Sequence, residues 1–149
     1  KQKVKRMYGL TETQFRTIYT RASHLPGVKG TNLLVALETR LDNIVYRMGF
    51  AASRRAARQL VRHGHVEVNG RKLDIPSYKV LPGQEVRVAP SDREMLAVKV
   101  AQDQASRGAT VSWLSVDAEK AAGRLLELPT RDAIPVNATE QLIVELYSK

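Results

Sequence analysis

The sequence predicts an α+β fold for a chain of 149 residues. Up to residue 63, apolar residues recur with the period of about 3.6 that is typical of amphipathic helices. From residue 65 to residue 89 they alternate with a period of two, which predicts strands. Hydrophobic residues make up 43% of the chain, so there is enough apolar material for a core. The length suits one ordinary domain or two small ones.

The chain opens with a basic segment, "KQKVKR", and an amphipathic helix follows it. The basic segment is either a solvated tail or an arm that orders on contact with phosphates, and its cations are Lys1, Lys3, Lys5 and Arg6. "TETQFRTIYTRASHL" predicts a helix that Thr11 and Gln14 begin as a capping box. Its apolar face consists of Phe15, Ile18, Tyr19, Ala22 and Leu25. Pro26 and Gly27 end the helix.

One further helix is predicted over "TNLLVALETRLDNIVYRMGF", residues 31–50. Its apolar positions recur at helical spacing, and they are Leu37, Leu41, Ile44, Val45 and Met48. Gly49 ends it. Arg40 and Arg47 are seven residues apart and therefore share a face.

The next helix is predicted over "SRRAARQLVRH", with Ser53 as its N-cap and Gly64 as its terminator. On a helical wheel one arc holds four arginines, Arg54, Arg55, Arg58 and Arg62. The opposite side holds Ala56, Ala57, Leu60 and Val61, which predicts a seam against the core. A charged stripe can be a plain solvated face, but solvated faces usually mix signs. This helix has no acidic residue, which favours a surface that binds a polyanion.

Strands follow the arginine-rich helix. "HVEV" alternates, "NG" is a strong hairpin signal, and "RKL" begins the return strand. "SYKVLPGQEVRVA" predicts a second strand pair around Pro82 and Gly83. The cations on these strands are Arg71, Lys72, Lys79 and Arg87.

The last third of the chain predicts two more helices and at least one strand. "SDREMLAVKVAQDQASRG" predicts a helix with Ser91 and Glu94 as its capping box. "TVSWLSVD" predicts a strand, and "AGRLLELP" fits either a strand or a helix. "NATEQLIVELYSK" predicts a closing amphipathic helix with Asn137 as its N-cap.

The charge distribution points to a polyanion partner. The formal net charge is +9. Residues 1–99 hold 19 Lys and Arg against 8 Asp and Glu, whereas residues 100–149 hold 5 against 7. The binding surface is therefore expected in the first two thirds, for a nucleic acid rather than an anionic membrane. No apolar run approaches the length of about 18 residues that a membrane span needs, so no membrane partner is expected. The absence of Cys fits a cytoplasmic protein.

The sequence offers no catalytic or metal site. The three histidines, His24, His63 and His65, lack the context of a hydrolase triad, and no phosphate-binding glycine loop occurs. "HGH" supplies two histidines that cannot close a tetrahedral metal shell, so neither a metal nor another cofactor is expected. In this basic corner His63 and His65 either contact a nucleic acid or are ordinary corner residues. Trp113 and five tyrosines are few for a stacking platform, which favours recognition of folded RNA through phosphates and 2′-hydroxyls.

At residues 40–88 the sequence closely resembles a known RNA-binding module. "RLDNIVYRMGFAASRRAARQLVRHGHVEVNGRKLDIPSYKVLPGQEVRV" is similar to the module named after bacterial small-subunit ribosomal protein S-four. The flanking runs "KQKVKRMYGLTETQF" and "TEQLIVELYSK" resemble the body and the C-terminus of that ribosomal family. The resemblance covers essentially the whole chain.

The resemblance implies two domains. A helical domain would combine residues 1–39 with residues 128–149, including the C-terminal helix. Between them an α/β RNA-binding domain would be inserted at residues 40–127, with a core module at 40–88 in which a helix pair packs on an antiparallel sheet.

The resemblance also implies a function. Members bind small-subunit rRNA directly at a helix junction of its 5′ domain, nucleate assembly of the subunit body and influence translational accuracy. Their partners include protein S-five, and they lie near the mRNA entry path. We expect a cytoplasmic ribosomal protein, part of a ribonucleoprotein, and not an enzyme. In it Arg54, Arg58 and Arg62 would grip phosphates, with Arg55, Arg40 and Arg47 beside them.

Two features depart from the family pattern. Members usually carry a further segment before "KQKV", with zinc-binding cysteines in some, so no zinc site is assigned here. Where members often have "RxPERS", this chain has "ELPTRDAIP", and no contact is carried over to that stretch.

Two alternative functions would use the same module. An RNA-modifying or aminoacylating enzyme would use the same module as an anchor, but no catalytic domain remains outside it. A free-standing regulator would bind an operon mRNA or stalled ribosomes with the same module.

Overall fold

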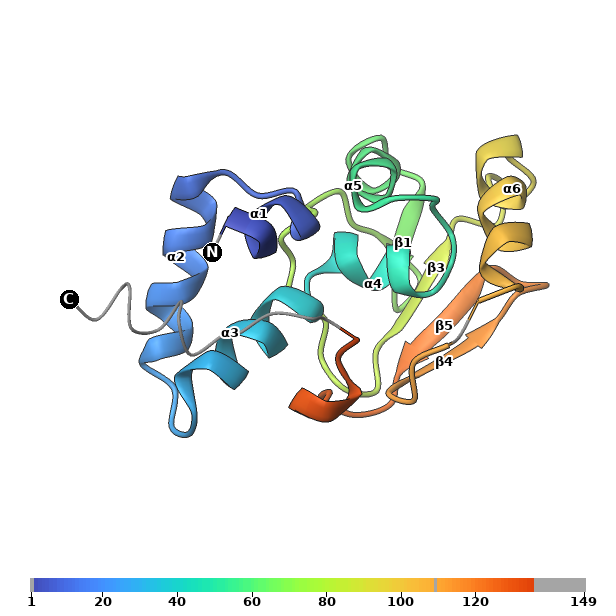
Figure 1. The fold of residues 1–149 in the computed structure, drawn as a ribbon. Coiled ribbons are helices and arrows are strands. Elements are labelled where there is room, and N and C mark those ends of the chain that lie inside the picture. Colours follow the sequence, from blue (N-terminus) through green and yellow to red (C-terminus); the bar gives the residue numbers. More distant parts are fainter. Residues whose placement is uncertain (1, 109, 136–149) are drawn as a thin grey trace. The chain divides into compact units, whose positions relative to one another are not determined.

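The computed structural model describes residues 2–108 and 110–135, and the chain divides into two compact units (Figure 1). The first unit combines Lys1–Glu38 with Pro129–Lys149, and the second is the continuous stretch Thr39–Leu128. The described residues form six α-helices, one short 3₁₀ helix and a five-stranded antiparallel sheet, so the predicted α+β fold is confirmed.

The first unit is helical in its described part. It contains helices α1 (Gln2–Tyr8), α2 (Glu12–Ser23) and α3 (Lys29–Glu38) and the 3₁₀ helix η1 (Arg131–Ala133). The capping box predicted for α2 is present, because the Thr11 hydroxyl accepts a bond from the Gln14 amide and the Gln14 side chain accepts one from the Thr11 amide. The core contains Val4, Phe15, Leu33, Leu34, Leu37 and Ile134, among others.

The opening basic segment is a helix, so the solvated tail, one of the two alternatives for this segment, does not fit its described residues. Val4 and Tyr8 are buried in the core of the unit, four residues apart on one face of α1. Lys5 on the same helix donates a bond of 2.7 Å from Nζ to the carboxylate of Glu12. The apolar pair Val4 and Tyr8, which lies among the cations of this segment, fixes it to the core.

The single helix predicted over residues 31–50 is also wrong, because the chain forms α3 and a separate helix α4 (Leu41–Arg47). Arg40 is extended, with φ −64° and ψ 143°. Its neighbours bond across to residues 78–80: the Leu41 amide donates to the Tyr78 carbonyl, and the Val80 amide donates to the Thr39 carbonyl. These bonds replace helical ones, so the helix ends between the two units.

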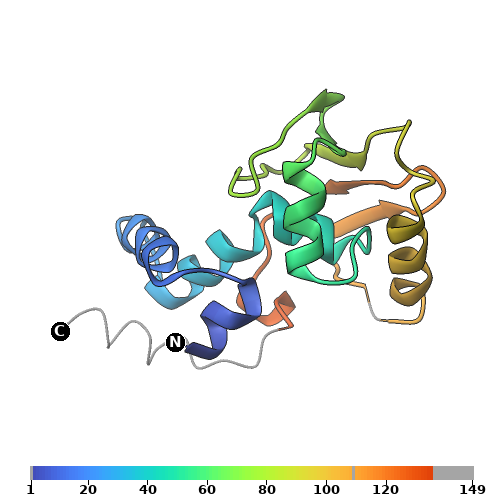
Figure 2. The same cartoon turned by 90° about the horizontal axis from the view of Figure 1, so that it is seen from above.

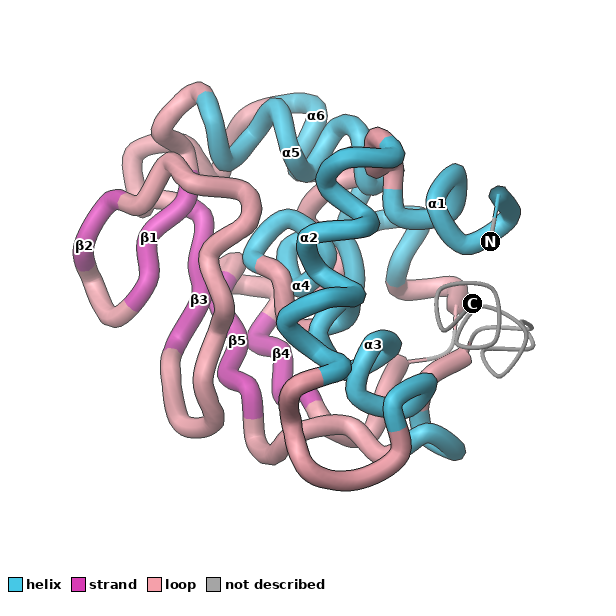
Figure 3. The backbone as a smooth tube through the Cα atoms, turned by 90° about the vertical axis from the view of Figure 1, so that its left-hand side faces the viewer, coloured by secondary structure: helices cyan, strands magenta, loops and turns pink. Residues whose placement is uncertain are grey.

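The sheet of the second unit has the order β2-β1-β3-β5-β4, and every pair is antiparallel (Figure 3). Its strands are β1 (Val66–Val68), β2 (Arg71–Lys72), β3 (Glu85–Val88), β4 (Leu114–Asp117) and β5 (Ala122–Leu125). Helices α4, α5 (Arg54–Arg62) and α6 (Leu96–Ala105) lie on one side of it (Figure 2). The side chains of Val66, Val86 and Val88 are buried there.

The predicted Asn-Gly hairpin is confirmed, whereas the second strand pair is not. Asn69 and Gly70 both have positive φ, 49° and 81°, as a tight turn between β1 and β2 requires. Of residues 77–89, Glu85–Val88 form β3. Residues 78–80 instead bond to the chain at Thr39–Leu41, with one isolated bridge between Lys79 and Arg40.

The last third of the chain corrects one prediction and resolves another. Helix α6 begins after Met95, and residues 89–95 form turns, so the capping box of Ser91 and Glu94 is wrong. The strand predicted over "TVSWLSVD" is confirmed as β4, and the ambiguous "AGRLLELP" contains strand β5. The closing helix predicted from Asn137 lies outside the described residues.

One glycine lets helix α4 and the sheet pack closely. A Cβ atom on Gly123 of β5 would lie 2.5 Å from the carbonyl oxygen of Ser115 on β4. It would also lie 2.8 Å from the sulfur of Met48, the C-cap of α4. The space above Gly123 is therefore filled by the end of α4.

Candidate nucleic-acid interface

Helix α5 forms where its caps and apolar seam predict it. The Ser53 hydroxyl accepts a bond of 3.0 Å from the Ala56 amide, as an N-cap should. After the C-cap His63 the chain turns through Gly64 with φ 80°. Ala57, Leu60 and Val61 are buried, which confirms the seam, whereas Ala56 is half-buried.

The four arginines of α5 fall into two pairs. Arg55 and Arg62 are exposed, and in the described part of the chain neither side chain makes a hydrogen bond or an ion pair. Arg54 and Arg58 are half-buried and bond to helix α4. The single stripe of the helical wheel therefore consists of an outer pair, Arg55 and Arg62, and an inner pair, Arg54 and Arg58.

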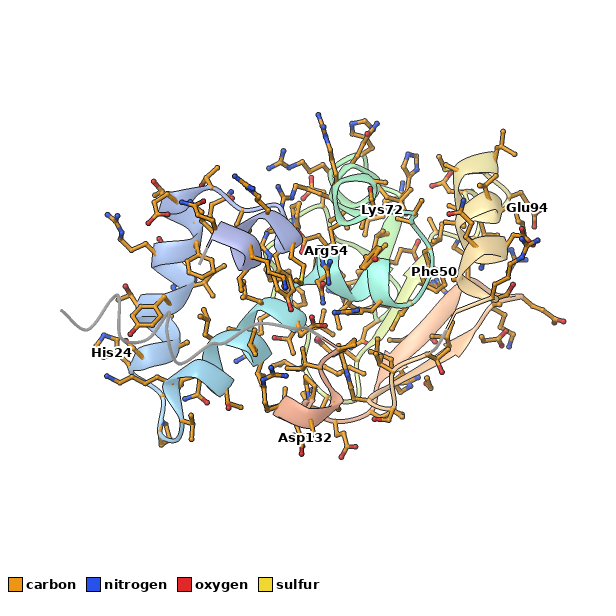
Figure 4. The ribbon with its side chains drawn as sticks, viewed as in Figure 1. His24, Phe50, Arg54, Lys72, Glu94 and Asp132 are labelled. Carbon is orange, nitrogen blue, oxygen red and sulfur yellow. The ribbon has the colours of Figure 1, made fainter. Side chains whose placement is uncertain are left out.

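Arg54 is held by two residues of α4. Its Nε donates a bond of 2.7 Å to Oδ1 of Asn43, and its guanidinium lies over the Tyr46 ring, 4.6 Å from the centroid. Figure 4 labels Arg54 beside helix α4. Arg47 lies near the same ring at 6.0 Å. Tyr46 therefore lies beside two cations, at distances typical of cation–π contacts.

Arg58 is held by the carboxylate of Asp42. Its Nε donates a bond of 3.3 Å to Oδ2 of Asp42, whose side chain is 4% exposed. Arg40 donates to both oxygens of the same carboxylate, at 3.2 Å and 3.1 Å. Arg40 was predicted to contact RNA. It is instead buried in this ion pair, because the break before α4 turns it toward Asp42.

The corner after α5 and the β1–β2 hairpin add further cations. His63 is exposed, and so are Arg71 and Lys72 on the edge strand β2. Nδ1 of the half-buried His65 lies 3.0 Å from Oδ2 of Asp92. The hydrogen bond to His65 lowers the pKa of Asp92 below its ordinary value, and the charges of His65 and Lys72 add to this.

The N-terminal cations belong to the other unit. Lys3 and Arg6 are exposed on α1, and Lys5 is partly buried by its bond to Glu12. Lys1 lies outside the described residues. Lys3, Lys5 and Arg6 therefore belong to the first unit, whereas helix α5 belongs to the second.

In the second unit, four residues that contact the predicted site residues were not singled out from the sequence: Asp42, Asn43, Tyr46 and Asp92. An available signal was the acidic residue between Arg40 and the apolar run of α4, because Asp commonly lies in the first turn of a helix beside a cation. His65 and Asp92 are 27 residues apart, and no sequence pattern joins them.

Two other features, a metal centre and a membrane-spanning helix, are absent from the described residues. No group of three or more His, Cys, Asp or Glu side chains is placed to hold a metal ion. None of the helices described is long and apolar enough to cross a membrane. Trp113 is buried in the second unit, at 1% exposure.

Two family models match the chain. Residues 39–86 match the S4 domain, and residues 1–38 match the ribosomal protein S4/S9 N-terminal domain. The two matches meet between Glu38 and Thr39, where the first unit passes into the second.

Relatives that match over the whole of this chain agree with these family matches. The chain is 51% identical to "Small ribosomal subunit protein uS4" of Acidobacterium capsulatum, over 100% of this chain and 71% of the relative. It is 52% identical to "Small ribosomal subunit protein uS4A" of Myxococcus xanthus, over 100% of this chain and 72% of that protein. It is 49% identical to the uS4 protein of Thermus thermophilus, again over 100% of this chain and 71% of the relative.

Proposed function

Because the chain belongs to the uS4 family of small ribosomal subunit proteins, we propose that α5 and the β1–β2 hairpin bind small-subunit rRNA directly. Proteins of this family are not enzymes. They are structural components of the ribosome in the cytoplasm, where they take part in translation.

The outer arginine pair carries the proposal. Arg55 and Arg62 are exposed on a helix without an acidic residue, and their charges have no partner in the described part of the chain. Two such charges on one short helix repel each other in the free protein. Phosphate oxygens relieve that repulsion, and the counterions released from the RNA add to the free energy of binding. RNA binding is therefore the role that best fits this surface.

The inner pair and the corner extend the contact surface. Arg54 and Arg58 lie on the same arc of α5 as the outer pair and are held by hydrogen bonds to α4. Arg47 lies beside Tyr46. His63 and His65 follow the C-terminus of α5, and the edge strand adds Arg71 and Lys72. Lys1, Lys3, Lys5 and Arg6, which belong to the first unit, supply further phosphate contacts. Arg40 is left out because it is buried.

We further propose the role that the family resemblance implies. The chain binds at a helix junction in the 5′ domain of the rRNA and nucleates assembly of the subunit body. It contacts protein S-five, lies near the mRNA entry path and influences translational accuracy. Its two-unit organisation supports this, because a helical unit and an S4 domain unit offer two contact surfaces for one folded RNA.

The test is the salt dependence of binding between the full chain and protein-free small-subunit rRNA. The logarithm of the binding constant should fall linearly with the logarithm of salt, by about 0.7–0.9 for each phosphate neutralised. We expect Arg62→Ala and Arg55→Ala each to weaken binding and to make this slope shallower by about that amount.

Arg107→Ala is the matched control. Arg107 is exposed at 78% of its side chain and lies just after α6, and its loss changes the net charge by the same amount. Its variant should keep the parental slope. The proposal is wrong if all three variants weaken binding equally, or if the two α5 variants match the parent.

A second experiment tests the finer role. Footprinting of the chain on the same rRNA should protect a helix junction of the 5′ domain. Tagged protein should sediment with small subunits. A free-standing regulator would instead leave the subunits and remain with mRNA or with stalled ribosomes, and that result would exclude the ribosomal role for this chain.

A further inference from the structure

We propose that Asp92 is a positioning residue for RNA binding. It holds the ring of His65 so that Nε2 is left open to solvent and binds a phosphate only when the ring is protonated on both nitrogens. This inference rests on the proposed function and deepens it, because it makes RNA binding a step that takes up a proton at one named atom.

The backbone fixes both residues at the corner between helix α5 and the sheet. After Gly64 the His65 amide donates to the Leu60 carbonyl at 3.2 Å, and the His65 carbonyl accepts a bond of 2.7 Å from the Ala89 amide. The Asp92 amide donates to the Ala89 carbonyl, also at 2.7 Å. The two side chains therefore meet from segments whose main chains are joined through residue 89, and Nδ1 of His65 lies 3.0 Å from Oδ2 of Asp92.

The second nitrogen of the ring is accessible. In the part of the chain that the structure describes, the His65 ring makes its hydrogen bond to Asp92 and an edge contact to the His63 ring, with 6.4 Å between the centroids. Every buried side-chain nitrogen or oxygen of the described residues has a hydrogen-bond partner, so Nε2, which has none there, is open to solvent. A ligand can therefore reach Nε2 from the solvent.

Charged and titratable groups reach this corner from three elements. Asp92 comes from the turns after β3, His63 is the C-cap of α5, and Lys72 lies on β2, where its charge acts on Asp92. The hydrogen bond to His65 lowers the pKa of Asp92, and the charges of His65 and Lys72 add to this. The side chain of Asp92 is therefore an ionised carboxylate at neutral pH, which accepts hydrogen bonds and donates none.

This carboxylate decides which nitrogen of His65 holds the proton. A neutral imidazole has one N–H donor and one acceptor nitrogen, and the nitrogen that faces a carboxylate is the donor, here Nδ1. Nε2 is then an acceptor. A phosphate oxygen is an acceptor as well, so the neutral ring cannot bind it. An imidazolium has donors at both nitrogens and can bridge Asp92 and a phosphate, so docking takes one proton from the solvent onto Nε2.

The alternative is that the pair of His65 and Asp92 only stabilises this corner of the fold. A structural pair changes RNA affinity through the folded fraction and the net charge, and neither depends on the tautomer of His65. Asp92→Asn separates the two roles, because an amide has a donor as well as an acceptor and can donate to Nδ1. The proton of the neutral ring can then lie on Nε2, which binds a phosphate without proton uptake.

The first test is the pH dependence of binding between the full chain and protein-free small-subunit rRNA, at constant salt, from about pH 8 to about pH 6, where histidines titrate. A nearby opposite charge favours the charged form of a group by about 1–3 pKa units, and one unit is about tenfold in affinity. We expect His65→Gln to remove a gain of about 3–10-fold from the parent. In the Asp92→Asn background, His65→Gln should remove less than about 2-fold, because the neutral ring already binds there.

Asp103→Asn is the matched control. Asp103 lies on α6 with its side chain 68% exposed, and its loss raises the formal net charge from +9 to +10, as the loss of Asp92 does. Its variant should keep the parental pH dependence. The titration of His63 is present in every variant and cancels in the comparison. Circular dichroism at both pH values establishes that each variant is folded.

A second test needs no RNA and no variant. Nitrogen NMR of the imidazole rings in the free chain distinguishes a protonated Nδ1 from a protonated Nε2. At about pH 8 we expect the proton of His65 on Nδ1 in the parent. A share of it should move to Nε2 in Asp92→Asn. The parental spectrum alone keeps the inference testable if Asp92→Asn does not fold.

The outcomes separate this inference from the proposed function. If His65→Gln removes the same gain in the parent and in the Asp92→Asn background, or if parental His65 carries its proton on Nε2, the positioning role is wrong and the RNA surface stands. If His65→Gln leaves the parental pH dependence unchanged, His65 takes up no proton, and this also overturns the inference. If Arg55→Ala and Arg62→Ala bind like the parent, the proposed function fails first.

Discussion

Replacing Gly123 with alanine tests how closely helix α4 is packed on the sheet. The added Cβ would lie 2.5 Å from the Ser115 carbonyl oxygen and 2.8 Å from the Met48 sulfur. Met48 can move its flexible end, but Ser115 presents backbone that is paired with Arg124 in the sheet. The cost is therefore overpacking, which is about 1–3 kcal/mol, and we expect the upper part of that range because one of the two contacts is backbone.

The measurement is thermal unfolding of the parent and the variant. For a unit of about this size, 1 kcal/mol shifts the midpoint by roughly 4–8 °C. Gly108→Ala is the matched control, since its Cβ would meet its nearest atom, the carbonyl oxygen of Ala105, at an ordinary 3.7 Å. We expect that control to melt within about 0.5 kcal/mol of the parent, as surface substitutions usually do.

Two results would refute this reasoning. If Gly123→Ala melts like Gly108→Ala, helix α4 does not lie as close to β5 as described. If Gly123→Ala is destabilised but Gly123→Ala with Met48→Ala loses the full sum of the single effects, Met48 is not the neighbour that the new methyl meets. A shared contact predicts that the double variant loses less than that sum.

Two further predictions concern helix α5 and its corner. Ala57→Glu puts a carboxylate at a fully buried position of the seam and should lower the free energy of unfolding by several kcal/mol, whereas Gln59→Glu, at an exposed position, should melt nearly like the parent. Equal melting of both would mean that α5 packs through another face. Asp92→Asn should alter acid stability: its hydrogen bond to His65 lowers the pKa of Asp92, so the carboxylate stabilises the fold above the ordinary value of 3.8 and loses this effect as pH falls through the lowered pKa. The stability difference between parent and variant should therefore shrink in acid urea titrations, and a difference that is constant from neutral pH to pH 2 would contradict the pairing.

The sequence predicted the elements whose signals are local. The capping box of α2, the Ser53 cap, the buried seam of α5 and the Asn-Gly turn each depend on residues within a few positions of one another. Such signals act through backbone conformation and nearest neighbours, so they need no knowledge of the tertiary structure.

The errors arose where distant segments compete for the same backbone groups. An apolar period continues from α3 into α4, but residues 78–80 take the hydrogen bonds around Thr39 and Leu41, and the helix breaks there. The same bonds explain why residues 77–81 do not form the predicted strand. The period of the apolar residues indicates which face of a segment is buried. It does not indicate which backbone amides and carbonyls will form hydrogen bonds with a distant segment.

The sequence predicted which cations belong to the candidate site, but it did not predict how helix α4 arranges them. A helical wheel places the four arginines of α5 on one arc. In the structure two of them, Arg54 and Arg58, donate hydrogen bonds to side chains of α4, and the other two do not. Arg40, which was predicted to contact RNA, is buried because the carboxylate of Asp42, two residues away, accepts its hydrogen bonds. Which arginine is paired and which is unpaired depends on the helix pair, so it follows from packing and not from sequence spacing.

The order in which the ribosome synthesises this chain has a consequence for its two units. Thr39–Leu128 is continuous, so it contains all of its own core once Leu128 has left the exit tunnel. The core of the other unit includes Ile134 together with Val4, Phe15 and Leu33. This core cannot be completed until Ile134 has been synthesised and has left the tunnel. We therefore expect the middle of the nascent chain to reach its native packing while the N-terminal helices still lack one side of their core.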